Sequence, residues 1–287
     1  ELEIGWWDDF VGPNKIIDTN KFFVVCANYI GGCYGSTGPS SKDPVTEESY
    51  GYNFPPISFK DIEVSQKQLL DHLGVKSLHA VIGPSIGGLM ALEFCTLYPN
   101  FVNKLISISS GYKLSTIQLL HNLEQAYILD LGKDSEVRKE EYLSLARMIA
   151  HKTYISLELL SKRAKNDSLY DDDLIKGFLG SPQESYMMHQ GEKFIERFTP
   201  ESYNSIIQGW QNFSIDIKSI SNLQNVNTLV LSVDSDVCFY PEEQTDFVNI
   251  LKDNKVQTTY HMIQSTKGHD SFLLEPELFK EIIENFL

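Results

Sequence analysis

Short apolar runs alternate with segments of helical periodicity along the first part of this chain, and this alternation limits its fold more than any other feature. The runs at 21–29 (KFFVVCANY), 77–83 (SLHAVIG) and 102–110 (VNKLISISS) are nearly continuous in apolar residues, as strands buried on both faces are. Apolar spacings of three and four predict helices over 58–74 and 87–99 between them. This order predicts a mostly parallel sheet with helices on both faces.

A long helical stretch interrupts the sheet pattern. Residues 114 to about 222 carry little strand signal, and the sheet pattern resumes at 226–234 (VNTLVLSVD). A helix over 241–253, a strand over 256–263 and a last helix over 276–287 follow. We therefore expect one α/β fold that a helical lid interrupts, with boundaries at 1–112 for the first part of the core, 113–224 for the lid and 225–287 for the second part of the core.

Composition excludes several classes of function. The formal charge of −15 comes from 24 Lys and Arg against 39 Asp and Glu, with no basic cluster that could bind a nucleic-acid backbone. No apolar run approaches the roughly 18 residues that a membrane span needs. The four cysteines form no CxxC pair and no zinc-like spacing with histidine. We expect a cytoplasmic protein that binds no nucleic acid and no membrane.

One serine lies where an apolar strand gives way to an apolar helix. Gly83-Pro84-Ser85-Ile86-Gly87 matches G-x-S-x-G, the motif of a sharp strand-to-helix turn that exposes a nucleophilic serine above a sheet. Gly83 and Gly87 are expected in this nucleophile elbow because side chains there would collide with the neighbouring strand and helix. The motif is common by chance, but its position between "LHAVI" and "GLMALEF" is the context that it requires.

A serine hydroxyl needs a base to take its proton and an acid to orient that base. Asp234 and Asp236 both follow a predicted strand, and His269 lies in a glycine-marked loop after the next strand. The order Ser, Asp, His is the one expected in hydrolase-type sheets, at the carboxyl ends of strands. The sequence alone does not choose between the two aspartates, since a loop aspartate can equally cap a turn. We expect no metal, because no second histidine with ligand spacing accompanies the pair.

Several strings resemble the homoserine O-acetyltransferase family of the α/β-hydrolase superfamily, in the family's order and over nearly the whole chain. They are GWWDDFVGPNKIIDTNKFFVVCANYIGGCYGSTGPSS, DHLGVKSLHAVIGPSIGG, LARMIAHKTYIS, QGEKFIERFTPESY, DSDVCFYPEEQ and GHDSFLLE. The resemblance implies an α/β-hydrolase fold with a helical lid, no bound cofactor, acetyl-CoA as acyl donor, and a homodimer joined through lid helices.

The resemblance also implies a mechanism. Ser85 would take the acetyl group from acetyl-CoA, His269 would act as general base, and Asp236, rather than Asp234, would orient His269. The backbone N–H of Ile86 would supply half of the oxyanion hole. Homoserine would then receive the acetyl group, as in methionine biosynthesis.

This chain departs from the family pattern in two places. Family members carry leading strands and an H-A-L-T-G loop, the second oxyanion donor, before the Gly-Trp-Trp segment, and nothing here matches them. Because the sequence begins at Glu1, we expect an N-terminal part to be omitted from it. The arginine of the family stretch N-E-V-x-R-Q-A-I, expected to bind the amino-acid carboxylate, falls at Ala126. Asn122 is kept, and Gln211 is a plausible counterpart of a family acid.

Three interpretations follow. The first is a serine-dependent O-acyltransferase of the homoserine O-acetyltransferase type. The second is an esterase, or a transferase to another small acceptor, because a bidentate guanidinium is hard to replace in carboxylate binding. The third is a catalytically silent relative that binds without turnover. The complete set Ser85, Asp236 and His269 argues against the third.

Overall fold

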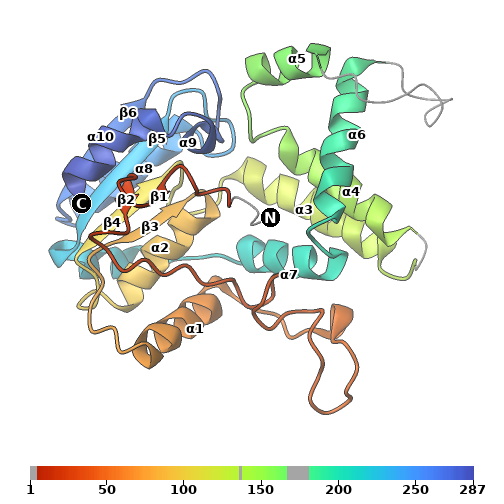
Figure 1. The fold of residues 1–287 in the computed structure, drawn as a ribbon, viewed down its shortest axis with the longest axis horizontal. Coiled ribbons are helices and arrows are strands. Elements are labelled where there is room, and N and C mark those ends of the chain that lie inside the picture. Colours follow the sequence, from red (N-terminus) through yellow and green to blue (C-terminus); the bar gives the residue numbers. More distant parts are fainter. Residues whose placement is uncertain (1–4, 136–137, 167–180) are drawn as a thin grey trace. The chain divides into compact units, whose positions relative to one another are not determined.

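A computed structural model describes residues 5–135, 138–166 and 181–287 of the chain (Figure 1). Its contacts divide the chain into two compact units, each of which is described by itself. Unit 1 comprises residues 1–27, 66–113 and 215–287, and unit 2 comprises residues 28–65 and 114–214. The division predicted at residues 112 and 224 remains a prediction for the intact protein.

Unit 1 is built on a parallel four-stranded sheet in the order β3-β4-β5-β6. The strands are β3 (Val81–Pro84), β4 (Lys104–Ile108), β5 (Asn227–Val233) and β6 (Thr258–Ile263). The register pairs Pro84 with Ile108, Ile108 with Leu231, and Leu231 with His261. Because all four strands run in one direction, their carboxyl ends lie along one edge of the sheet, as predicted. A two-residue ladder between β1 (Val11–Gly12) and β2 (Ile17–Asp18) lies outside this sheet.

Apolar side chains of the central strands alternate between two cores, one on each face of the sheet. On β5, Val230 belongs to a core with Leu92 of α2 (Ile86–Leu97) and Phe247 of α8 (Pro241–Asp253). Its neighbours Leu229 and Leu231 belong to the other core, with Phe279 and Ile283 of α10 (Glu277–Phe286). Strand side chains point alternately to opposite faces, so a strand buried on both sides reads as a continuous apolar run. The predicted sheet with helices on both faces is confirmed.

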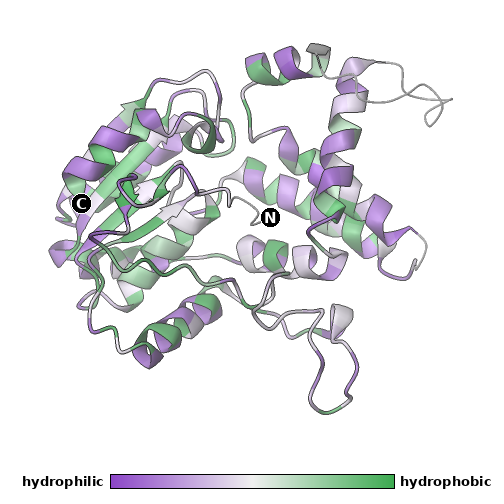
Figure 2. Ribbon diagram, in the orientation of Figure 1, coloured by the Kyte–Doolittle hydropathy of each residue, from purple (hydrophilic) through white to green (hydrophobic). Residues whose placement is uncertain are grey.

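The helices of unit 1 are α1 (Phe59–His72), which continues from unit 2 into unit 1, α2 (Ile86–Leu97), η2 (Ile217–Asn225), α8 (Pro241–Asp253), α9 (Ser271–Leu274) and α10 (Glu277–Phe286). Four helices, α1, α2, α8 and α10, begin and end within two residues of their predicted positions, whereas the short helices η2 and α9 were not predicted individually. Figure 2 shows α10 striped in hydrophilic and hydrophobic residues, the pattern of a helix with one buried side. Gly74, with φ of 74°, follows α1, and glycine is the residue that most readily adopts this conformation after a helix.

The strand predicted at 21–29 is wrong. These residues form no strand in the structure, and Phe23 and Val25 are 78% and 36% exposed. A strand requires a neighbour with which to share its backbone hydrogen bonds. Among the described residues the segment pairs with no strand, so its apolar composition alone does not make it part of the sheet.

Unit 2 consists mainly of helices, in agreement with the helical pattern of the sequence. Leu129, Leu143, Ala146, Phe194 and Ile207 form an apolar core of this unit. Side-chain caps fix three of the helix starts: Ser115 and Ser181 form capping boxes, and Thr199 accepts a hydrogen bond from the N–H of Ser202. The elements are η1 (Gly51–Asn53), α3 (Thr116–Gly132), α4 (Lys139–His151), α5 (Leu157–Asn166), α6 (Pro182–Ile195) and α7 (Pro200–Gln211).

Candidate active site

Ser85 lies between the end of β3 and the first residue of α2. Its backbone has φ of 54° and ψ of −130°, a conformation that is strained for a residue with a side chain. Its N–H donates to the carbonyl of Ile108 on β4, and its own carbonyl accepts the N–H of Gly88. Strained backbone that neighbouring bonds hold in place is typical of a nucleophile elbow.

Close contacts with neighbouring backbone and with the side chain of Ser110 explain two of the glycines around the turn. A Cβ on Gly83 would lie 2.0 Å from the carbonyl oxygen of Gly87, and one on Gly88 would lie 2.4 Å from Cβ of Ser110. A Cβ on Gly87 would meet only Cδ of Pro84, at 3.4 Å, which is ordinary contact. The steric requirement predicted for Gly83 and Gly87 therefore applies to Gly83 and, in place of Gly87, to Gly88.

Ser110 contributes to the elbow although the sequence did not single it out. Its hydroxyl donates to the carbonyl of Ser85 at 2.6 Å, and the residue is fully buried after β4. Pairing of Pro84 with Ile108 brings the residues that follow these two strands together. The only sequence signal was the small-residue run Ser109-Ser110-Gly111 after a predicted strand.

Asp236 and His269 form a buried pair beyond the ends of β5 and β6. Oδ2 of Asp236 lies 2.8 Å from Nδ1 of His269, and the two residues are 1% and 2% exposed. Oδ1 of Asp236 accepts the N–H groups of Cys238 and Phe239, at 2.8 and 2.9 Å. These bonds fix the carboxylate, which in turn fixes the orientation of the imidazole.

Asp234 has a different role. Its Oδ1 accepts the N–H of Ser265 at 2.9 Å, so its carboxylate caps a turn of the loop after β6. The geometry thus separates the two aspartates that the sequence left open: Asp236 contacts the imidazole and Asp234 holds backbone.

The environment of His269 shifts its proton affinity. Burial alone would lower the pKa of His269, but the charge of Asp236, its hydrogen bond and the charge of Asp270 together raise the pKa above its ordinary value. A negative partner that stabilises the imidazolium is what a general base needs while it holds a proton.

Aromatic rings enclose the imidazole. Phe239 stacks on His269 with ring centroids 5.6 Å apart, and Phe272 meets it edge to face at 5.7 Å. Trp7 stacks in turn on Phe272. These rings restrict rotation of His269, and no sequence pattern would have assigned them to the site.

The order of the parallel strands places Ser85 at the same edge of the sheet as Asp236 and His269. Ser85 directly follows β3, Asp236 comes three residues after β5, and His269 comes six residues after β6, all at the carboxyl-end edge of one sheet. Adjacent strands are about 4.8 Å apart, which puts β3 and β5 roughly 10 Å apart. Ile86, as the first residue of α2, has a backbone N–H without a carbonyl partner inside the helix. Ser85 is thus at the edge where the Asp236–His269 pair lies, and its catalytic role stays a prediction.

The substrate-binding positions expected from the family pattern lie in unit 2. Ala126 packs against the apolar core formed by Leu129 and its neighbours, so no charged group occupies that position. Asn122 is 1% exposed, and its Nδ2 has no hydrogen-bond partner among the described residues. Gln211, the last residue of α7, has a buried Oε1 that is likewise unsatisfied within the described part of the chain.

The residues that the structure describes contain no group of three His, Cys, Asp or Glu side chains that could hold a metal ion. Asp171, Asp172 and Asp173, expected in a solvated turn, lie outside the described residues. None of the described helices is both long and apolar enough to cross a bilayer.

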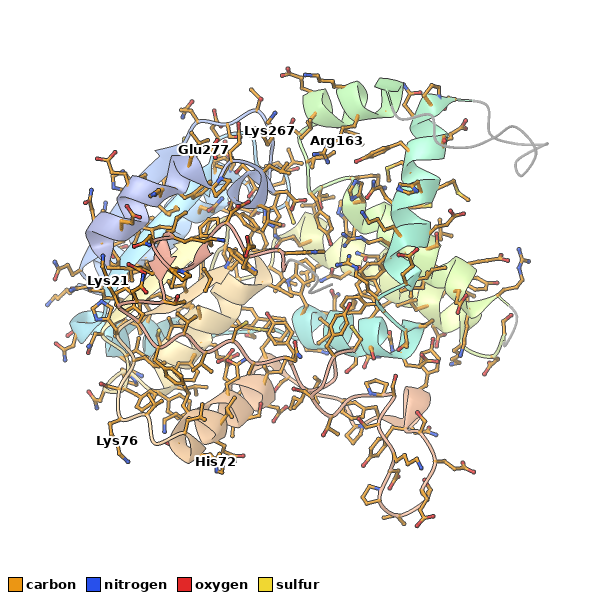
Figure 3. All side chains as sticks on the ribbon, in the orientation of Figure 1. Lys21, His72, Lys76, Arg163, Lys267 and Glu277 are labelled. Carbon is orange, nitrogen blue, oxygen red and sulfur yellow. The ribbon has the colours of Figure 1, made fainter. Side chains whose placement is uncertain are left out.

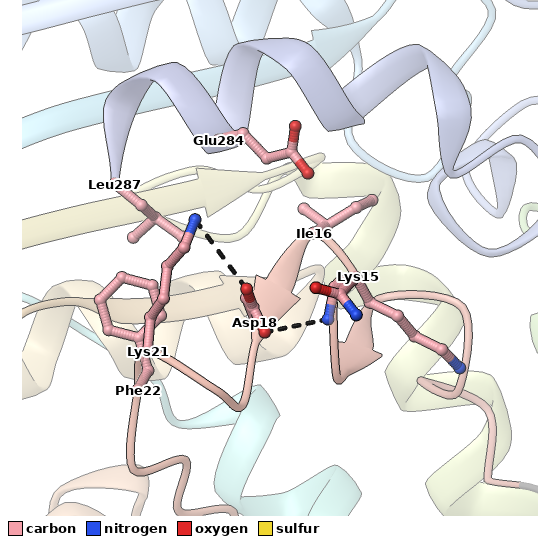
Figure 4. Close-up of a pocket in the computed structure, with 8 residues that line it drawn as sticks. Lys15, Ile16, Asp18, Lys21, Phe22, Glu284 and Leu287 are labelled. Carbon is pink, nitrogen blue, oxygen red and sulfur yellow. Dashed lines mark hydrogen bonds and ion pairs between the residues drawn. The ribbon is translucent and has the colours of Figure 1, made fainter.

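A pocket of about 410 Å³ lies elsewhere in unit 1, between residues 14–22 and the end of α10 (Figure 4). Its two lysines are paired: Lys15 with Asp8 at 2.8 Å and Lys21 with Asp18 at 3.9 Å. The backbone N–H groups of Asn14 and Asn20 lower the pKa of Asp18. The predicted catalytic residues do not line this pocket, and its remaining charged side chain, Glu284, pairs with Lys280 at 3.8 Å.

A family model described as the alpha/beta hydrolase fold matches residues 5–276. This chain belongs to the α/β-hydrolase family. It is 40% identical to a homoserine O-acetyltransferase of Methanosalsum zhilinae and 36% identical to one of Methanococcus vannielii. Each alignment covers 99% of this chain and 60% of the relative, so the chain spans about 60% of the length of these curated relatives. The resemblance expected from the sequence is confirmed.

Solved structures agree on the fold. A homoserine O-acetyltransferase from Bacillus anthracis superposes with a TM-score of 0.89 at 24% identity, covering 100% of this chain and 82% of that one. Esterase E22 superposes with the same TM-score of 0.89 at 20% identity, covering 100% and 83%. Since the fold is common to a transferase and an esterase, it does not by itself distinguish the two activities.

Proposed function

We propose that this protein is a serine-nucleophile O-acyltransferase that moves an acetyl group from acetyl-CoA to the hydroxyl of homoserine. The observation that carries the proposal is the buried Asp236–His269 pair at the sheet edge where the strained Ser85 turn lies. The 40% identity to a homoserine O-acetyltransferase supports the choice of reaction.

In the first half-reaction, Oγ of Ser85 attacks the thioester carbonyl while His269 takes its proton. The C–S bond breaks, the proton passes to the sulfur, and free CoA leaves an acetyl ester on Ser85. The N–H of Ile86 stabilises the tetrahedral oxyanion, because the first residues of a helix offer unpaired donors and the positive end of its dipole.

In the second half-reaction, His269 takes the proton of the acceptor hydroxyl, whose oxygen attacks the acetyl ester. The ester bond to Ser85 breaks, Oγ recovers its proton from His269, and O-acetylhomoserine leaves. Asp236 keeps Nδ1 of His269 protonated throughout, so that Nε2 serves as the base.

The acceptor side of the site departs from the family pattern. The described lid residues offer Ala126 where the family pattern has an arginine. An esterase, with water as acceptor, is the second candidate, and Ala126 in place of the family arginine favours it. Acetyl-CoA as donor needs no resident cofactor.

We also propose a homodimer through the helices of unit 2, in the cytoplasm. On α3, Leu120, Leu123, Tyr127 and Leu131 recur at spacings of three and four and are 49–61% exposed. The opposite face of α3 buries polar Gln118, Asn122 and Gln125. An exposed apolar helix face of this kind supports an interface.

The test measures CoA release from acetyl-CoA in three parallel reactions, with homoserine, with serine and without an amino acid. Release that depends on homoserine supports the transferase, and equal release without an acceptor supports the esterase. Mass spectrometry of the protein after a brief incubation should show an acetyl group on Ser85. Absence of both acetyl-Ser85 and CoA release from the intact protein would refute both activities.

A further inference from the structure

Three consecutive side chains of the loop after β5 hold the loop that carries His269. Asp234 accepts the N–H of Ser265, Ser235 contacts Ser265 and Gly268, and Asp236 contacts His269. The first, second and third residues of the run thus fix successive points of residues 265–269. Lys267, labelled in Figure 3, belongs to this second loop.

Ser235, the middle residue of the three, forms two hydrogen bonds with the loop that carries His269. Its hydroxyl donates to the carbonyl of Ser265 at 2.5 Å, and its Oγ accepts the N–H of Gly268 at 3.0 Å. Gly268 directly precedes His269 and has φ of 83°, a conformation open mainly to glycine. The bond to Gly268 therefore acts at the backbone bend from which the imidazole projects.

Ser265 extends the same network away from the pair. Oγ of Ser265 donates to Oε2 of Glu275, at the end of α9, and accepts the N–H of Lys267 at 3.0 Å. The residue is 9% exposed, so its backbone and side-chain polar groups depend on these partners. The loop is thereby fixed on one side by residues 234–236 and on the other by α9.

We propose that Ser235 is a positioning residue, which holds Gly268 and Ser265 so that the imidazole of His269 keeps its place on Asp236. This inference rests on the proposed function, in which His269 is the base. Without the Ser235 hydroxyl, the N–H of Gly268 loses its acceptor. The position of the His269 imidazole relative to Asp236 is then less well fixed. A displacement of about 1 Å in a catalytic group costs on the order of 100-fold in rate.

The test compares the intact wild-type protein with Ser235→Ala, Ser235→Thr and a control, Ser221→Ala. Ser221 also donates its hydroxyl to a carbonyl, that of Lys218, but on the exposed surface of unit 1. The readouts are kcat and KM for p-nitrophenyl acetate, the pH profile of kcat, and the downfield proton resonance of Nδ1–H of His269. Assignment of that resonance uses its loss in His269→Gln.

Ser235→Ala should lower kcat by about 10- to 100-fold with little change in KM. It should also shift or broaden the His269 resonance and move the acid limb of the pH profile. Ser235→Thr, which keeps the hydroxyl, should recover most of kcat, and Ser221→Ala should match the wild type in all three readouts.

An unchanged kcat in Ser235→Ala, or a lowered kcat with an unmoved resonance and pH profile, would overturn the proposal. If Ser235→Ala does not fold, Ser235→Cys gives the same readouts with a weak donor and acceptor in place of the hydroxyl. If the wild type is inactive, the proposed function fails, while the resonance of Ser235→Ala still decides whether Ser235 positions His269.

Discussion

Oδ2 of Asp236 lies 2.8 Å from Nδ1 of His269, and both side chains are almost completely buried. Asp234, only two residues earlier, points its carboxylate at the N–H of Ser265 instead. Two aspartates that look equivalent in the sequence therefore have different roles: Asp236 orients His269 and Asp234 holds backbone. Substitution of each should have a different effect on kcat.

Asp236→Asn should lower kcat by about 10⁴-fold, because an amide cannot keep Nδ1 of His269 as the protonated nitrogen. Steady-state CoA release from acetyl-CoA measures the loss. Asp234→Asn is the matched control, since its amide oxygen can still accept the N–H of Ser265, and its kcat should stay within a few-fold of wild type. Equal losses in the two variants would contradict the assignment.

The pH dependence follows from the same pair. Burial lowers the pKa of His269, but Asp236 and Asp270 raise it to a net value above its ordinary 6.5. Since only neutral imidazole accepts a proton, acetylation of Ser85 should rise with pH along a limb whose midpoint lies above about 6.5. Stopped-flow measurement of p-nitrophenolate release across pH gives that midpoint.

The contribution of His269 to the free energy of unfolding should fall as pH rises, whereas the rate of Ser85 acetylation should rise. A pKa raised in the folded state means that the protonated His269 contributes stability below its unfolded pKa of about 6.5, and this contribution is lost as pH rises through the folded pKa. The difference in free energy of unfolding between wild type and Asp236→Asn should therefore shrink as pH rises through that range. A difference that grows with pH would show that Asp236 does not raise the pKa of His269.

The glycines of the elbow should not be equivalent. Gly83→Ala puts a Cβ within 2.0 Å of the Gly87 carbonyl oxygen and should lower the free energy of unfolding by at least about 1–3 kcal/mol. Gly87→Ala meets only ordinary contact and gains helix propensity, so its stability should equal or exceed wild type. Urea denaturation measures both, and a larger loss in Gly87→Ala would contradict the geometry described for the turn.

The fold was predictable where the local pattern of apolar residues is enough to determine a helix or a strand. β5 alternates its side chains between two apolar cores, so its sequence is apolar throughout, and α8 was placed at its observed bounds, Pro241–Asp253. Segment 21–29 has the same apolar composition but no partner strand among the described residues. Strand pairing depends on a distant neighbour, which a local pattern does not contain.

The site was predictable where chemistry demands a residue type. Ser85, Asp236 and His269 follow from the motif, the strand ends and the family strings. Ser110 and Ser235 could not be found in this way, because their roles arise from backbone groups that the fold brings near. A serine in a loop has no distinguishing pattern until the acceptor of its hydroxyl is known.

Leu123→Lys combined with Tyr127→Lys should convert a dimer of the intact protein into a monomer. The two side chains are 56% and 61% exposed on the apolar face of α3, and burying two charges in an interface without partners costs several kcal/mol. Sedimentation velocity of wild type and double variant at equal concentration measures the change.

A charge at an isolated apolar residue provides the control. Leu157, at the start of α5, is 69% exposed and lies outside the α3 face, so Leu157→Lys should leave the sedimentation coefficient unchanged. Loss of the dimer in Leu157→Lys, or its retention in the α3 double variant, would place the interface elsewhere than α3. The buried side of α3 places Leu129 in an apolar core of unit 2, beside polar Gln118, Asn122 and Gln125, so the double variant changes only exposed side chains and leaves that core intact.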